Sequence, residues 1–337
     1  MANYLGYLPE NDQLHHFLKY EIQPQLRGFS RRVRYRVFQL TGSNDVYLYE
    51  EKYSGQKVIG KFFLSRTERN IDIATRKFQR EYHHLSLMRN YGFTASPHYI
   101  ARPLGRNDDL NKLLVIEYCY GEQLDSIIQR AIHRREDALL FSKLTALAYF
   151  LASFHNRTAN CYRVDFNETC FYFDRLIDRL RWVNLVGQGD ADELYWLRDR
   201  WKEQSKMWSD FQVLVHGDAT PDNFLFGDGM SVISFDLERL HRADRLFDVG
   251  RLAGELQHFF MNISGNKYAA ERFIGHFLWE YACHFPDRKA AFRAISARIP
   301  FYMGITLLRI ARNDYLVWNY RKRLAHEAKL CLRSTHL

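Results

Sequence analysis

Apolar and polar residues alternate in three successive stretches near the start of the chain: Val33–Gln39, Val46–Glu51 and Lys57–Phe63. The segments that separate them, residues 40–45 and 54–56, are rich in glycine, serine and other turn formers. Alternation with a period of two, interrupted by turns, is typical of strands with one buried face. The pattern therefore predicts an antiparallel meander of three strands.

The pattern then changes to a helical period. Between about Ile71 and Tyr91, apolar residues recur every three or four positions, which predicts one long helix. Two strand-like runs follow, at residues 98–103 and 113–119, and nearly all of the remaining chain has helical periodicity. The expected fold class is therefore α+β, with a small antiparallel sheet followed by a mostly helical part. Further helices are predicted at residues 12–21, 139–155 and 249–261, with two or three more in the aromatic-rich stretch 165–212.

The composition is that of a folded protein of a reducing compartment. Of the 337 residues, 47% are hydrophobic and 15% aromatic, which is ample for a packed core. The five cysteines are scattered and odd in number, which argues against a disulfide scaffold or a zinc site. The N-terminus lacks the pattern of a signal peptide, and no apolar run approaches the ~20 residues that span a bilayer. We therefore expect a cytoplasmic protein that does not insert into a membrane.

Three polar residues stand at the ends of short apolar runs in the second half of the chain. Asp218 and Asn223 lie between two such runs, and Asp236 ends a third, Val232–Phe235. Any one of them alone would be an ordinary turn residue. Together they match phosphoryl transfer, which needs a group that orients the attacking hydroxyl and oxygen ligands that hold Mg²⁺. We predict that Asp218 is the base that accepts or orients the proton of the acceptor hydroxyl, and that Asn223 and Asp236 bind Mg²⁺.

The same segment carries a resemblance to a known family. His216-Gly217-Asp218, Asn223 five positions after Asp218, and Phe235-Asp236-Leu237-Glu238 resemble the aminoglycoside phosphotransferase and choline kinase group. The resemblance is strongest over residues 213–251 and weaker over most of the chain. It implies a bilobal protein-kinase-like fold that binds Mg-ATP between its lobes and phosphorylates a small-molecule hydroxyl. The implied lobes are residues 1–116, which cover the nucleotide, and 117–337, which carry the catalytic loop and the acceptor site.

The resemblance also implies roles for residues of the N-terminal lobe. Lys61, in the third strand of the meander, would contact the nucleotide phosphates and be held by Glu81 of the following helix. The turn that contains Ser43 and Asn44 would cover the phosphates, although a plain hairpin turn explains it equally well. Backbone groups near Glu117 and Cys119 would read the adenine.

Four further residues are assigned structural roles or, for one of them, two alternative roles. Asp248 would cap the helix that follows it and support the catalytic loop. His155 and His216 are expected to be structural. Glu238 would either assist the metal or face solvent.

The chain departs from protein kinases at several points. It has no glycine-rich loop, Gly217 stands where an arginine is usual, and no glycine follows Asp236 directly. We also find no recognisable activation segment, which favours a small-molecule acceptor. The alternative is a nucleotide-binding regulatory protein of the same fold without turnover. A nucleic-acid-binding module is suggested only by the basic balance, and no helix-turn-helix, zinc or RNA-binding signature supports it.

The net charge of +9 is unevenly distributed. Residues 239–337 hold 17 Lys and Arg against 8 Asp and Glu, a balance of +9 that equals the whole excess. Solvated helix faces would explain this, and so would an acidic ligand. The spacing of Arg309 and Arg312 would place two guanidinium groups on one helix face, suited to a carboxylate or phosphate. We therefore predict an acceptor, or a docking partner, that is neutral or anionic. Nothing in the sequence decides the oligomeric state or the choice between ATP and GTP.

Overall fold

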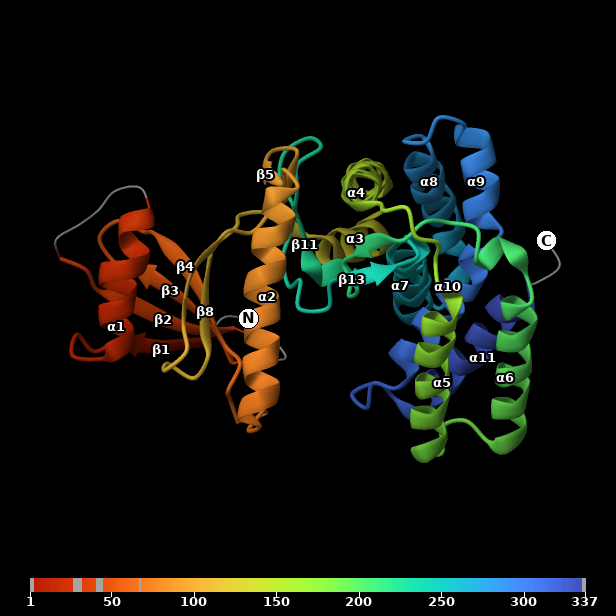
Figure 1. Cartoon of the computed structure of the whole chain (residues 1–337), viewed down its shortest axis with the longest axis horizontal. Coiled ribbons are helices and arrows are strands. Elements are labelled where there is room, and N and C mark those ends of the chain that lie inside the picture. The colour runs from red at the N-terminus through yellow and green to blue at the C-terminus, as the bar shows by residue number, and fades with distance from the viewer. Residues whose placement is uncertain (1–2, 27–31, 41–44, 67, 335–337) are drawn as a thin grey trace. The chain divides into compact units, whose positions relative to one another are not determined.

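The structure is a computed structural model that describes residues 3–26, 32–40, 45–66 and 68–334. Its internal packing divides the chain into two compact units. Unit 1 comprises Met1–Gly121 and Ile233–Glu238, and unit 2 comprises Glu122–Val232 and Arg239–Leu337. The first division follows Gly121, five residues beyond the lobe boundary expected after residue 116, and a short segment around Asp236 packs with unit 1. Unit 1 is built on an antiparallel sheet and unit 2 is mostly helical (Figure 1), so the predicted α+β class is confirmed.

The sheet of unit 1 has six antiparallel strands in the order β1-β2-β3-β4-β8-β7. The predicted meander is confirmed as β2, β3 and β4, with Tyr35 opposite Glu51 and Val46 opposite Lys61. The sequence reading missed β1, which pairs with β2 at one edge. The strands of this sheet are β1 (Asn3–Tyr7), β2 (Tyr35–Leu40), β3 (Asp45–Glu51), β4 (Lys57–Phe62), β7 (Pro103–Asn107) and β8 (Leu113–Glu117).

Alternation along the strands gives the sheet two different faces. On one face, Leu113 and Val115 of β8 join a core formed with α1 (Gln13–Phe17) and the turns after it. The residues that alternate with these along the strands point to the other face. They pack toward α2 (Ile71–Asn90), which contacts β7 and β8 (Figure 1). Lys61 lies directly opposite Leu114 in the β4–β8 pair. Because opposed residues of an antiparallel pair share a face, Lys61 projects toward α2.

Helix α2 begins where the sequence predicts. The side chain of Asn70 accepts hydrogen bonds from the backbone N–H groups of Asp72 and Ile73, which satisfies two donors that a helix start leaves free. Phe78, Leu85 and the other apolar residues of one stripe are fully buried. Glu81 lies in the same stripe and is also buried, so α2 holds a carboxylate against the sheet.

Unit 2 is built from nine helices among the described residues, with short strand pairs between them (Figure 1). Helix α4 is mostly buried, as its continuous apolar pattern predicted. By length and hydropathy alone, α4 could cross a membrane, and so could the bent pair formed by Arg288–Ser296 and Ile299–Ala311. However, 56% of the apolar window of α4 is buried inside the protein, as is usual for a core helix. The helices are α3 (Leu124–Arg134), α4 (Asp137–Thr158), α5 (Phe166–Trp182), α6 (Gln188–Lys202), α7 (Leu246–Ser264), α8 (Glu271–Ala282), α9 (Arg288–Ser296), α10 (Ile299–Ala311) and α11 (Trp318–Arg333).

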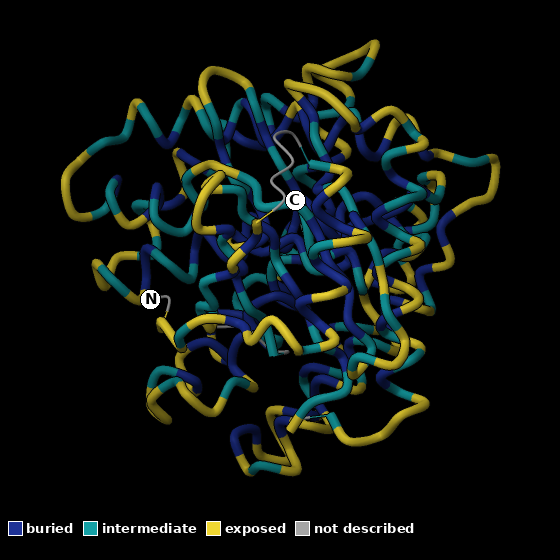
Figure 2. Tube along the Cα trace, turned by 90° about the vertical axis from the view of Figure 1, so that its left-hand side faces the viewer, coloured by how far each residue is buried: buried dark blue, intermediate teal, exposed yellow. Residues whose placement is uncertain are grey.

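Helices α7 and α10 approach each other closely. A Cβ atom on Gly250 of α7 would lie 2.2 Å from the Cβ of Tyr302 on α10, so only glycine allows this spacing. The strands β10 (Val213–Val215) and β13 (His241–Ala243) pair antiparallel on either side of the segment that carries Asp218. Buried segments, dark blue in Figure 2, form the interior, and the exposed residues lie in turns and on the outer faces of helices.

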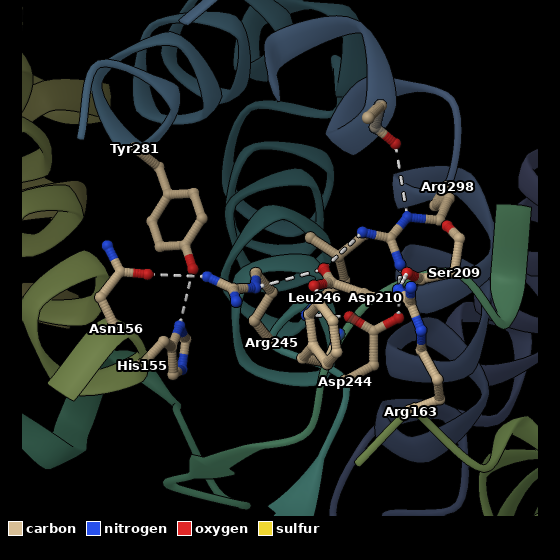
Figure 3. Close-up of polar contacts among 12 residues, drawn as sticks. His155, Asn156, Arg163, Ser209, Asp210, Asp244, Arg245, Leu246, Tyr281 and Arg298 are labelled. Carbon is tan, nitrogen blue, oxygen red and sulfur yellow. Dashed lines mark hydrogen bonds and ion pairs between the residues drawn. The ribbon is translucent and has the colours of Figure 1, made fainter. Parts of the chain in front are cut away.

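A buried ionic network ties the loop before β10 to the start of α7 and to α10 (Figure 3). Arg298 donates to Asp244 at 2.8 Å and to Asp210 at 2.9 Å, and Tyr302 donates to Asp244 at 2.9 Å. Arg245 contacts Asp210 at 3.2 Å. Four charged groups are thus buried as mutual partners, the arrangement in which burial of charge is tolerated. The interpretation of the basic C-terminal residues as solvated helix faces is therefore wrong for Arg298, which is buried.

Two local predictions need correction. Asp248 does not cap α7, because the helix begins at Leu246 and Asp248 lies inside its first turn. The backbone N–H of Leu246 is bound instead by the Asp244 side chain. The helix expected over residues 12–21 is a short α-helix that continues as a π-helical turn, Leu18–Ile22.

Candidate active site

The predicted lysine–glutamate pair is present in unit 1, and Asp236 joins it. The Lys61 ammonium donates to Glu81 at 2.6 Å and to Asp236 at 2.8 Å. The three side chains come from β4, from α2 and from the segment after β12 (Val232–Ser234). Burial alone would lower the pKa of Lys61, but the charges of Glu81 and Asp236 outweigh it and raise that pKa. Lys61 is therefore a permanent cation held at a defined position.

Acidic groups outnumber the lysine at this point. Ligand oxygens of Glu81, Asp236 and Glu238 all lie within 4.8 Å of one another. Glu238 thus lies beside the other two carboxylates, and its role toward a metal stays a prediction. Three carboxylates against one ammonium leave negative charge, and carboxylate oxygens are the ligands that Mg²⁺ and Ca²⁺ prefer. The donor set of this acidic cluster (Glu81, Asp236 and Glu238) fits a hard divalent cation.

The backbone around Asp236 is held in an unusual conformation. Asp236 has a φ of +61°, in the left-handed region that non-glycine residues rarely occupy. The segment is anchored on both sides within unit 1. The backbone N–H of Ala101 donates to Ser234, and His84 Nδ1 donates to the carbonyl of Leu237 at 2.7 Å. Such strain persists only where the surroundings impose it, and it is often found at functional sites.

In unit 2, the segment after β10 is fixed by a buried aspartate. Asp248 accepts hydrogen bonds from the backbone N–H groups of His216 at 2.6 Å and Gly217 at 3.1 Å. His155 binds the same carboxylate at 3.2 Å, and the Tyr281 hydroxyl at 2.8 Å. Asp248 and His155 therefore support this loop, as expected, although His155 lies inside α4 rather than at its end.

Gly217 explains one departure from the kinase pattern. Its φ is +78°, and a Cβ atom there would lie 2.1 Å from the backbone oxygen of Arg239. A side chain at this position would require both a left-handed backbone and a shift of the opposing strand connection. The loop that presents Asp218 is therefore built around glycine.

Asp218 is surrounded by arginines. Its Oδ1 accepts from Arg251 at 2.7 Å and from Arg309 at 2.6 Å, and its Oδ2 lies 3.5 Å from Arg239. Burial would raise the pKa of Asp218, but Arg309, Arg251 and Arg239 outweigh it and hold that pKa below its usual range. Asp218 is therefore ionised at neutral pH and is a weak proton acceptor, which suits a residue that orients a hydroxyl.

Asn223 is also held close to this loop. It ends a short 3₁₀ turn, Pro221–Asn223, and its amide nitrogen donates to the backbone carbonyl of Asp218 at 2.8 Å. This bond uses the donor end of the amide. The amide oxygen is the atom with which Asn223 would bind a metal.

The remaining predicted residues are less informative. Ser43 and Asn44 lie outside the described residues. Glu117 ends β8, where its carboxylate accepts from Tyr99 at 2.6 Å and its backbone N–H donates to Arg102. Burial raises the pKa of the Cys119 thiol to about 12, so Cys119 is a neutral group. The roles of Glu117 and Cys119 toward a nucleotide stay predictions.

Sequence reasoning missed the arginines around Asp218. Arg251 lies one helical turn after Asp248 and Arg309 was noted only for its charge, so no motif marked either as a partner of Asp218. Arg309 donates to Asp218 and to Glu255 at 3.2 Å. Arg312 lies close enough for burial, together with the charge of Arg309, to lower the pKa of Arg312, and the binding of an anion by the two arginines stays a prediction. Helix α7 packs closely against α10 at Gly250, and this packing brings Arg309 near Asp218. A contact between helices so far apart in the chain leaves no pattern within a short stretch of sequence.

Comparison with known proteins decides the family. The phosphotransferase enzyme family model matches residues 35–285, well over half of the chain. The chain belongs to this family. The membership confirms the resemblance seen in the sequence and supports phosphotransferase activity. No curated protein matches the chain in sequence.

Solved structures of the family share the fold at low sequence identity. A ternary complex of the aminoglycoside phosphotransferase APH(2")-IIa with streptomycin and ATP is 13% identical, with a TM-score of 0.56 over 98% of this chain and 100% of that one. Ethanolamine kinase from Plasmodium vivax is 12% identical, with a TM-score of 0.60 over 96% and 91%. Amicoumacin kinase, solved with AMP-PNP, Ca²⁺ and its ligand, is 15% identical, with a TM-score of 0.60 over 97% and 94%. The protein-kinase-like fold is thereby confirmed.

Proposed function

We propose that the protein is an ATP-dependent kinase that transfers the γ-phosphoryl group to a hydroxyl of a small molecule. The observation that carries the proposal is the position of Lys61, held between Glu81 at 2.6 Å and Asp236 at 2.8 Å. A strand lysine fixed by a helix glutamate is the device by which kinases hold nucleotide phosphates. Membership of the phosphotransferase enzyme family supports the same reaction.

The residues divide the work according to their surroundings. Lys61 binds the phosphate oxygens of the nucleotide, and Asp218 accepts a hydrogen bond from the acceptor hydroxyl and aligns its oxygen. That oxygen forms the new bond to the γ-phosphorus and the bond from phosphorus to the ADP oxygen breaks. Because Asp218 is a weak base, it takes the hydroxyl proton only after bonding to phosphorus has made that proton acidic, and then passes it to solvent. Asp236 and Asn223 are the proposed ligands of Mg²⁺, which offsets phosphate charge when bound.

The acceptor that we propose is neutral or anionic. Three arginines meet the one carboxylate that would orient the hydroxyl, which disfavours a polycationic compound next to it. The neighbouring structures named above include complexes with aminoglycosides, so this chain would differ from those proteins in its acceptor. The five free cysteines support a cytoplasmic location for the reaction.

The experiment is a screen for acceptor-dependent ADP release with Mg-ATP and, in parallel, Mg-GTP. The panel includes hydroxylated metabolites, nucleosides and aminoglycosides. We expect at least one acceptor to stimulate ADP release, and a matching phosphorylated product by mass spectrometry. Nucleotide-dependent stabilisation of the fold without release of ADP by any acceptor would instead indicate a nucleotide-binding regulatory protein.

A further inference from the structure

A cavity of about 290 Å³ lies within unit 2 beside the loop that presents Asp218. Its wall includes Gly217, Arg239 and Arg251, together with the aromatic side chains of Tyr172 and Phe247. The volume is close to the lower end of small-molecule pockets, which span about 300–1,000 Å³. The cavity therefore suits a compact ligand and adjoins the residue that would orient its hydroxyl.

The arginines here are part of a built site. Arg251 is 2% exposed, stacks on the Phe247 ring at 5.0 Å and donates to Gly217 and Asp218. Arg309 is fixed between Asp218 and Glu255. Within the described residues, the buried Nε atoms of both arginines have no hydrogen-bond partner. These atoms keep hydrogen-bonding capacity that a ligand could use.

Arginines and acids meet around Asp218. Arg239, Arg251 and Arg309 contact its carboxylate, and Arg309 also pairs with Glu255. Burial raises the pKa of Glu255 to about 7, so its charge is only partly present at neutral pH. The carboxylates of Asp222 and Asp248 also act electrostatically on Arg309 and Arg251, respectively. Acids therefore partly balance the arginines, and the capacity to bind an anion rests on Arg239 and Arg251, the two that line the cavity.

Three acids also line the cavity, and two of them are engaged elsewhere. Asp165 caps α5 through its side chain, and Asp244 is held by Arg298 and Tyr302. Glu168 is exposed, where water and salt screen its charge. The wall therefore carries acids as well as arginines, and the two acids with bonded partners leave Arg239 and Arg251 as the charged groups of the wall that contact Asp218.

We propose that the acceptor carries a phosphate or carboxylate group, and that Arg239 and Arg251, which line the cavity, bind this group next to Asp218. The proposal rests on the proposed kinase function and specifies its substrate class. Guanidinium groups bind these two anions through parallel N–H bonds, so they give both affinity and orientation. An anion bound here would place a hydroxyl a few bonds away against Asp218.

The first experiment compares acceptors that differ in charge alone. Glucose, glucosamine, gluconate and glucose 6-phosphate, and the corresponding three-carbon set, are offered with Mg-ATP at one fixed ionic strength. We expect kcat/KM for the anionic members to exceed that of their neutral counterparts by roughly tenfold or more, as for one added charge-assisted contact. The phosphate and carboxylate arms show which anion is preferred. A preference for the amino or neutral members would overturn the proposal and leave the kinase function intact.

The second experiment measures anion binding without turnover. Inorganic phosphate is titrated into the protein at constant ionic strength, and its affinity is read by calorimetry and by the shift of the melting temperature. We compare two variants that each remove one positive charge. Arg239→Gln removes it from a half-exposed residue of the site, and Arg293→Gln removes it from an exposed position of α9. Phosphate affinity is expected to fall roughly tenfold in Arg239→Gln and to stay unchanged in Arg293→Gln.

Equal phosphate affinity in the two variants, or no binding by the wild type, would contradict the anion site. Each outcome is separate from the kinase test, because ADP release with some acceptor would still support the enzyme. If Arg239→Gln does not fold, the acceptor comparison in the wild type decides the matter alone.

Discussion

Asp236 and Asp218 are both ionisable aspartates at the ends of short strands, yet their surroundings are opposite. Asp236 in unit 1 shares one lysine with Glu81, and Glu238 lies within ligand distance of both. Asp218 in unit 2 is contacted by three arginines. In the first centre carboxylates surround a lysine, and in the second arginines surround a carboxylate.

The difference shows that neighbours, rather than residue type, decide what an aspartate can do. Excess negative charge at Asp236 is a ready partner for a divalent cation. The arginines around Asp218 lower the pKa of its carboxyl group, so this group stays ionised at neutral pH. One aspartate is thus suited to bind metal and the other to orient a hydroxyl.

Replacing Asp218 is expected to have the largest effect. Asp218→Asn keeps the shape and one acceptor oxygen for Arg251 and Arg309, but it removes the negative charge that aligns the hydroxyl. We expect kcat to fall by about a hundredfold or more, while ATP affinity, measured by calorimetry, changes by no more than a few-fold. Wild-type turnover in a correctly folded variant would remove Asp218 from the mechanism.

Replacing Asp236 tests the other half of the comparison. Asp236→Ala removes a proposed metal ligand and one partner of Lys61, so we expect Mg-dependent nucleotide affinity to fall by roughly tenfold to a hundredfold. Nucleotide is titrated with and without Mg²⁺, and Asp228→Ala on an exposed loop is the control. An unchanged magnesium dependence in Asp236→Ala would mean that Asp236 is structural.

The backbone of the Asp218 loop can be tested through Gly217. Gly217→Ala places a Cβ atom against the backbone oxygen of Arg239, so we expect the free energy of unfolding to fall by about 3 kcal/mol or more. Gly229→Ala is the matched control, because its φ is +57° but nothing lies within 4 Å of the added atom. It should lose only about 1 kcal/mol. Urea unfolding measures both, and equal losses would show that the contact with Arg239 is unimportant.

The smallest effect concerns Glu255. Burial raises its pKa from the usual 4.5 to about 7 in the folded protein, and Arg309 opposes this. A raised folded pKa means that the native state binds a proton more tightly than the unfolded state. Its stabilising contribution is complete below pH 4.5 and is lost as the pH rises through 7. Relative to Glu255→Gln, the wild type should therefore lose roughly 1–2 kcal/mol between pH 5 and 8, measured by urea unfolding. A constant difference between the two proteins would indicate that Glu255 stays ionised.

Much of the first unit could be read from local patterns. The alternation in β2, β3 and β4 and the helical period of α2 each lie within a few dozen residues, so periodicity alone indicated their type and order. The lysine–glutamate pair was implied by the family resemblance together with this order of elements, and the structure contains it. Strand β1 was missed because it is a lone edge strand before an irregular segment.

The sequence by itself determined the family, the α+β class and the identity of the polar residues Asp218, Asn223 and Asp236, because these depend on short motifs and local periodicity. Only the tertiary structure decided which charges surround them. Arg309 reaches Asp218 across 91 positions of sequence because α10 packs closely against α7. Glu238 lies beside Glu81, more than 150 positions earlier in the chain, because the segment around Asp236 packs within unit 1. Such contacts depend on the packing of distant elements, and the electrostatic character of each site is a property of that packing.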